Sequence, residues 1–123
     1  MTARDEYVDF VQDILDIDQY AIGFLEGMPY AVFASDIKTI FAVMQAIEMM
    51  GEAAKRVPEP VRERYPAIPW KDLAGTRDRL IHNYPMANVA ILWTIVHEEL
   101  PPLLPLLEQM LNEITGGEQN SSR

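Results

Sequence analysis

The residue types best suited to chemistry gather in one stretch of the chain, Arg77-Asp78-Arg79-Leu80-Ile81-His82-Asn83-Tyr84, which Pro85 follows. The chain has only two histidines and no cysteine, so this cluster of arginine, histidine and tyrosine stands out. An imidazole can transfer a proton near neutral pH, and a guanidinium can bind a phosphate through two parallel hydrogen bonds. The stretch therefore holds the minimum groups for cleaving a phosphodiester, and we expect it to need neither a metal nor another cofactor.

The composition excludes several other classes of protein. A chain of 123 residues is long enough for one domain with its own core. Charged residues interrupt its long apolar stretches, which predicts no membrane association, and residues 1–6 lack the apolar run of a secretory signal. We therefore expect a cytoplasmic protein. The absence of cysteine excludes disulfides and thiolate metal sites, and two histidines disfavour a zinc site.

The net charge of −9 argues against a nucleic-acid partner, because such proteins normally carry a basic surface. The charges are unevenly distributed, however. Residues 55–79 hold seven of the ten cations and four acidic residues, whereas residues 1–54 hold two cations and ten acidic residues. Lys55, Arg56, Arg62 and Arg64 precede Arg77 in this segment. Each of them alone is typical of a solvated helix end, but together they would form a local anion-attracting surface.

Apolar residues spaced three and four apart predict an all-α protein. The expected architecture is a bundle of four main helices plus a short connecting helix. Residues 1–115 are expected to form the single domain and residues 116–123 a disordered polar tail. The predicted main helices cover residues 4–26, 36–56, 70–84 and 89–110, and the short helix covers residues 61–65.

Local signals place the ends of these helices. Gly27 is typical of the position that follows a helix, and Ser35 or Asp36 is typical of an N-cap. Gly51 lies in the middle of a predicted helix, which indicates close approach of another helix. Asn88 is expected to cap the last helix.

Further expectations concern the interior and the bends. The buried side of the second helix is expected to hold six positions, and three prolines are expected to bend or interrupt the last helix. The buried positions are Ile37, Ile40, Phe41, Met44, Ile47 and Met50 or Gly51, and the prolines are Pro101, Pro102 and Pro105.

A regular helix over residues 70–84 would place Arg77 in the middle of an apolar stripe that contains Trp70, Leu73 and Tyr84. A charge there needs a partner, either a carboxylate of the second helix such as Glu48 or Glu52, or a substrate phosphate. His82 would lie about 140° away on an ideal helix, on the polar side. Either the helix unwinds at residues 82–84, or a symmetric dimer brings two motifs together.

The Arg-x4-His-x-Tyr spacing, together with Ile68-Pro69-Trp70 and Gly51-Glu52-Ala53-Ala54-Lys55, resembles the HepT-like toxins of the HEPN superfamily over residues 39–107. The resemblance implies a homodimer with the cleft between protomers, and a metal-independent ribonuclease in which Arg77 and His82 are catalytic. It also implies a MntA-like nucleotidyltransferase antitoxin as partner, which silences the toxin by transferring AMP from ATP to Tyr84.

The implied reaction is cleavage of RNA by its own 2′-hydroxyl, with His82 as general base or acid and Arg77 neutralising charge on the phosphoryl oxygens. The products would carry a 2′,3′-cyclic phosphate. Tyr84 would stack on a base or bind the phosphate, or else simply complete the apolar stripe. Four further residues are expected to support the site: Asp78, which would orient the imidazole, Arg79, Glu52, and Asn83, where the family often has aspartate.

Two other interpretations remain open. In the first, the chain is a non-catalytic HEPN subunit that binds a nucleotide or substrate for a nucleotidyltransferase complex, with Arg77 and His82 as ligand contacts. In the second, it is a purely structural helical dimer. Pro85-Met86 replaces an aromatic residue and a glycine that are common after the motif tyrosine in the family.

Overall fold

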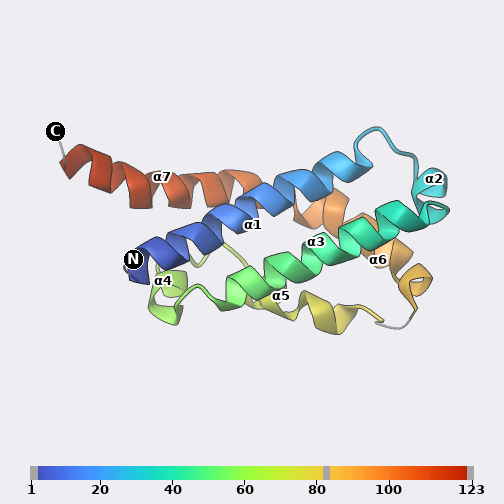
Figure 1. Cartoon of the computed structure of the whole chain (residues 1–123), viewed down its shortest axis with the longest axis horizontal. Helices are drawn as coiled ribbons and strands as arrows, with labels where there is room; N and C mark the ends of the chain where they lie inside the picture. Colours follow the sequence, from blue (N-terminus) through green and yellow to red (C-terminus); the bar gives the residue numbers. More distant parts are fainter. Residues whose placement is uncertain (1–2, 82–83, 122–123) are drawn as a thin grey trace.

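The structure is a computed structural model that describes residues 3–81 and 84–121, with side chains described for residues 6–81 and 84–116. The described part consists of helices and turns without a strand, which confirms the all-α prediction (Figure 1). It contains two 3₁₀ turns, η1 and η2, and one π turn, η3. In chain order the elements are α1 (Ala3–Leu25), α2 (Tyr30–Ala34), α3 (Ile37–Lys55), α4 (Glu59–Glu63), α5 (Trp70–Gly75), η1 (Thr76–Arg79), η2 (Pro85–Asn88), α6 (Val89–Thr94), η3 (Ile95–Glu99) and α7 (Leu103–Ser121).

The long helices α1 and α3 pack against each other and form the centre of the fold. Helix α7 packs on α1, and the short helix α5 packs on α3 (Figure 1). The core of the bundle is mostly aliphatic, and Ile14, Ile40 and Leu107 are fully buried in it. Phe33 is a fully buried aromatic residue of the same core. Burial of the core provides the main stabilisation of such a bundle. Helix α5 leads into the motif and packs on α3, so these two helices determine where the motif begins.

The ends of α1 and α3 confirm the local signals in the sequence. Helix α1 ends at Leu25, and Gly27 follows with φ of 74°, a conformation that favours glycine. Asp36 caps α3: its carboxylate accepts hydrogen bonds from the Thr39 amide at 3.2 Å and from the Thr39 hydroxyl at 2.7 Å. These hydrogen bonds lower the pKa of Asp36.

The buried side of α3 differs in part from the prediction. Ile37 and Phe41 are 47% and 53% exposed, so their assignment to the buried stripe is wrong, and Val43 and Ala46 are buried instead. The predicted apolar stripe therefore covered a different side of α3 from the one that is buried. Helix α2 was not predicted, and its Phe33 adds an aromatic side chain to the core.

The last predicted helix, over residues 89–110, is interrupted at Pro101 and Pro102 as predicted, whereas Pro105 lies in the first turn of the helix that follows, α7. Helix α6 continues into the π turn η3, and the chain bends by 53° before α7, at the break that contains Pro101 and Pro102. The helical backbone of α7 extends to Ser121, into the segment expected to be a disordered tail. In the described part of the chain no single helix is long and apolar enough to cross a membrane; only the bent pair of segments on either side of this break passes that test by length and composition.

Gly51 lies where α3 meets α5, as its position in mid-helix predicted. A Cβ added there would lie 2.8 Å from the Leu73 carbonyl oxygen, which is backbone and cannot rotate away. Gly51→Ala should therefore destabilise the protein by about 1–3 kcal/mol, despite a helix-propensity gain of about 1 kcal/mol. Chemical denaturation measures this, with Gly23→Ala as control, because a Cβ at Gly23 meets no atom within 4 Å. Equal stability of the two variants would contradict the close approach.

Candidate functional site

The helix that carries the motif ends much earlier than predicted. Helix α5 stops at Gly75, η1 follows over residues 76–79, and Leu80 is extended with φ of −104° and ψ of 146°. The cause is local: the Thr76 hydroxyl donates to the Asp72 carbonyl at 2.6 Å, while the Thr76 amide bonds the Leu73 carbonyl instead. The side chain thus takes the acceptor that the next helical hydrogen bond would use. The prediction of one helix over residues 70–84 is therefore wrong.

This change of helix type moves Arg77 to the surface. Arg77 is exposed, whereas Thr76 is buried, so the prediction of Arg77 in the middle of an apolar stripe is wrong. The partners proposed for it were Glu48 and Glu52. Glu52 instead accepts a hydrogen bond from Lys55 at 3.3 Å. Among the residues whose side chains are described, the Arg77 guanidinium makes no ion pair or hydrogen bond, which leaves it available to an anion.

Arg77 lines a groove of about 570 Å³ between α1, α3 and α5, which we call the Arg77 groove. Its walls carry both signs of charge, so the surface is mixed rather than basic. Lys55 and Arg56 lie in the groove with Arg77, and Arg56 also lies over the Phe10 ring, 5.7 Å from its centroid. Arg62 lines a separate hollow beside α4. The charged residues lining the Arg77 groove are Asp13, Asp16, Glu48, Glu52, Lys55, Arg56 and Arg77.

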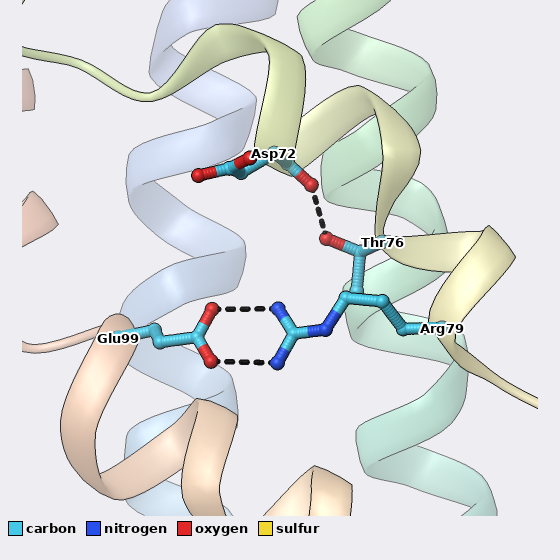
Figure 2. A network of polar contacts seen from close by, with 4 residues as sticks. All are labelled: Asp72, Thr76, Arg79 and Glu99. Atoms are coloured by element: carbon cyan, nitrogen blue, oxygen red, sulfur yellow. Dashed lines mark hydrogen bonds and ion pairs between the residues drawn. The ribbon is translucent and has the colours of Figure 1, made fainter.

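Arg79 points away from the Arg77 groove and joins η1 to η3. Its guanidinium donates two hydrogen bonds of 2.8 Å to the two carboxylate oxygens of Glu99 (Figure 2). This bidentate pair raises the pKa of Arg79 and lowers that of Glu99. Arg77 and Arg79 are two residues apart on η1, and a 3₁₀ helix has three residues per turn. Their side chains therefore leave η1 on different sides. Arg79 therefore anchors η1 to η3, and its partner Glu99 was not foreseen; its supporting role in the site stays a prediction.

The backbone after Asp78 leaves the helical conformation before His82 is reached in the sequence. The 3₁₀ turn η1 ends at Arg79, and Leu80 is extended. His82 and Asn83 themselves lie outside the described residues. The catalytic role predicted for His82 and the supporting roles predicted for Asp78 and Asn83 therefore remain predictions.

Tyr84 lies in an accessible turn rather than in the core. Its side chain is 69% exposed, which excludes the interpretation that it completes an apolar stripe. Its amide bonds the Ile81 carbonyl at 3.4 Å, and its own carbonyl accepts from the Ala87 amide at 2.9 Å. The backbone of Tyr84 is thus hydrogen-bonded through both its amide and its carbonyl, while the phenol is exposed to solvent.

Asn88 has a different role from the predicted helix cap. It is fully buried, and its side chain makes no capping hydrogen bond to α6. Instead, its amide oxygen accepts from the Ile81 amide at 2.8 Å, and its amide nitrogen donates to the Ile81 carbonyl at 2.9 Å. The N-cap prediction is wrong because the side chain reaches back across the turn. The position of Asn88 just before a predicted helix suggested a cap. Its hydrogen bonds to Ile81 could be recognised only from the three-dimensional structure.

An all-helical bundle that carries an Arg-x4-His-x-Tyr motif, with its arginine and tyrosine at the surface, is consistent with the HEPN class of domains that the sequence resembles. Within that class the chain belongs to the HepT-like family, whose model, described as Ribonuclease HepT-like, matches residues 5–110. The chain is 37% identical over 112 residues to "Putative RNase MJ1216" of Methanocaldococcus jannaschii, covering 91% of this chain and 93% of that protein. It is 36% identical over 107 residues to "Probable ribonuclease HepT" of Thermococcus cleftensis, covering 87% and 97%. No solved structure matches the chain.

Proposed function

We propose that this protein is a metal-independent endoribonuclease, the toxin of a toxin–antitoxin pair. The observation that carries the proposal is the exposed Arg77, which lines a groove and makes no ion pair among the residues whose side chains are described. The guanidinium of Arg77, which has no ion-pair partner in the described part of the chain, binds the phosphate electrostatically, and the histidine five residues later in the sequence supplies a proton-transfer group. The names of the relatives as ribonucleases support the same activity.

In the proposed reaction the 2′-hydroxyl of RNA attacks the adjacent phosphorus atom, and the bond to the 5′-oxygen breaks. His82 acts as general base for the hydroxyl proton or as general acid for the leaving oxygen. Arg77 neutralises the negative charge that develops on the phosphoryl oxygens. The products are a 2′,3′-cyclic phosphate and a free 5′-hydroxyl. DNA lacks the attacking hydroxyl and should not be cleaved.

We further propose that the active form is a homodimer. Supporting this, α1 and α3 expose five large apolar side chains, and two of them, Tyr20 and Met49, also line the Arg77 groove. Exposed apolar surface that gathers on one part of a protein is typical of an interface. A second protomer there would bring its own cations beside the mixed charges of the groove. The large exposed apolar residues of the two helices are Tyr20, Phe24, Ile37, Phe41 and Met49.

We propose that a MntA-like nucleotidyltransferase antitoxin silences the ribonuclease by adenylylation of Tyr84. What supports this is the position of Tyr84 in the motif together with its exposed phenol. Transfer forms a bond between the phenolic oxygen and the α-phosphorus of ATP and releases pyrophosphate. The attached AMP would add negative charge and bulk next to the RNA site, which opposes binding of another phosphodiester.

The proposed activity is tested with purified protein and a single-stranded RNA oligonucleotide in excess EDTA. A matched oligonucleotide carries one 2′-deoxy substitution at the cleaved position. We expect cleavage of the RNA to a 2′,3′-cyclic phosphate and no cleavage at the deoxy position. Mass spectrometry of the intact protein beforehand excludes an AMP adduct. Lack of RNA cleavage by unmodified protein would contradict the proposal.

A further inference from the structure

The Asn88 side chain links the two ends of the segment between η1 and α6. Leu80 at the start of this segment and Val89 just after its end are both buried in the core. Between them, Asn88 pairs with the peptide groups of Ile81 through hydrogen bonds of 2.8 and 2.9 Å. The chain that leaves η1 and the chain that enters α6 are therefore joined at this point, and the motif residues 82–84 lie between the joined ends in sequence.

Asn88 uses its amide fully in this arrangement. The oxygen accepts from the Ile81 amide, and the nitrogen donates both to the Ile81 carbonyl and to the Met44 sulfur at 3.8 Å. The contact with Met44 ties the turn to α3, which also forms a wall of the Arg77 groove. A buried amide with all of its donors used is held in one orientation. Asn88 thus fixes the turn relative to the helix that borders the groove.

The same hydrogen-bond set reaches Tyr84. The Ile81 carbonyl accepts from the Asn88 side chain and from the Tyr84 amide, at 2.9 and 3.4 Å. Ile81 itself is half-exposed, so its side chain provides little burial to hold this part of the turn. The positions of the Ile81 peptide group and of the Tyr84 amide that bonds to it therefore depend on Asn88.

We propose that Asn88 is a positioning residue for RNA cleavage, which holds the Ile81 peptide group and, through the Ile81 carbonyl, the backbone of Tyr84 in the geometry the reaction needs. This inference rests on the proposed ribonuclease function. Asn88 is buried and does not contact substrate; it acts through the backbone that carries the motif. A displacement of about 1 Å in a reacting group can cost about 100-fold in rate, so loss of this tether should act on the chemical step more than on binding.

The test compares Asn88→Ala and Asn88→Asp with the parent protein. Alanine removes both hydrogen bonds to Ile81, whereas aspartate keeps the acceptor and loses the donor. We expect Asn88→Ala to lower kcat for RNA cleavage by roughly 10- to 100-fold with KM changed less than about 2-fold. Asn88→Asp should fall between the alanine variant and the parent. Val57→Ala, a buried truncation in another part of the core, controls for general loss of stability and should keep the parental kcat.

Amide hydrogen exchange at Ile81 and Tyr84 gives a second measurement that does not depend on activity. Exchange at both amides should accelerate by about 10-fold or more in Asn88→Ala, and remain parental in Val57→Ala. Parental kcat together with parental exchange in folded Asn88→Ala would overturn the positioning role. Absence of cleavage by the parent protein would instead refute the ribonuclease proposal, and hydrogen exchange alone would then show whether Asn88 holds the turn.

Discussion

Replacing Arg77 with alanine is expected to lower kcat for RNA cleavage by about 10²- to 10³-fold, the usual cost of losing a charged group that stabilises a transition state. The free energy of unfolding should change by less than about 0.5 kcal/mol, because Arg77 is exposed and forms no ion pair among the residues whose side chains are described. Single-turnover kinetics and thermal denaturation of the same preparation measure the two effects. A large activity loss in a protein of normal stability would separate Arg77 from a structural role.

The control for Arg77→Ala is Lys71→Ala, which removes an exposed cation from α5 outside the Arg77 groove. If RNA is attracted only by general positive charge, the two variants should lose similar activity, and the loss should diminish at high salt. If Arg77 binds the reacting phosphate, only its removal should affect kcat. Arg77→Lys should restore part of kcat, because lysine keeps the charge but not the two parallel donors. Equal effects of Arg77→Ala and Lys71→Ala would contradict the proposed role.

The buried Asp18 should make the protein less stable as the pH rises from about 4 to about 7. This residue of α1 has no exposed surface, and neither of its carboxylate oxygens has a hydrogen-bond partner among the residues whose side chains are described. Burial raises its pKa from the usual 3.8 to about 7. Between pH 3.8 and about 7, Asp18 is therefore ionised in the unfolded chain but protonated in the folded protein. Ionisation thus favours the unfolded chain, by roughly 4 kcal/mol once the pH passes 7.

This prediction is measured by denaturant unfolding at several pH values for the parent protein, Asp18→Asn and Asp9→Asn. Asparagine at position 18 cannot ionise, so Asp18→Asn should lack the fall in stability that the ionisation of Asp18 causes. The free energy of unfolding of this variant should therefore increase relative to that of the parent protein as the pH rises. Asp9 lies exposed on the same helix, and its replacement should leave the pH dependence as in the parent. A parental pH dependence in Asp18→Asn would show that Asp18 is not the group responsible.

Much of the fold was predictable because its strongest signals are local. The repeat of apolar residues in α1 and α3 follows the helical period, and the Asp36 cap and Gly27 depend only on neighbouring residues. Gly51 is an intermediate case: the sequence indicated a close approach, and the structure shows the Leu73 carbonyl as the atom that requires it. The short helix α2 was missed because helices of one turn have too few residues for a periodic pattern.

The candidate site was less predictable, because the competing interactions are between side chain and backbone. The sequence did not show that the motif arginine and tyrosine both lie at the surface. Their exposure depends on the end of α5 at Gly75, where the Thr76 hydroxyl bonds the Asp72 carbonyl. The Arg79–Glu99 pair joins residues 20 positions apart, and no sequence pattern indicates it. Asn88 resembled a helix cap because caps and turn closures favour the same residue type.

The role of His82 in RNA cleavage is measured by comparing the parent protein with His82→Ala, both purified identically and assayed in excess EDTA. The parent protein should cleave RNA to a 2′,3′-cyclic phosphate, and His82→Ala should lose about 10²- to 10⁴-fold in kcat, the usual contribution of general acid–base catalysis. Equal cleavage by the two preparations would contradict the account, because it would indicate a contaminating nuclease or a reaction that does not use the motif histidine.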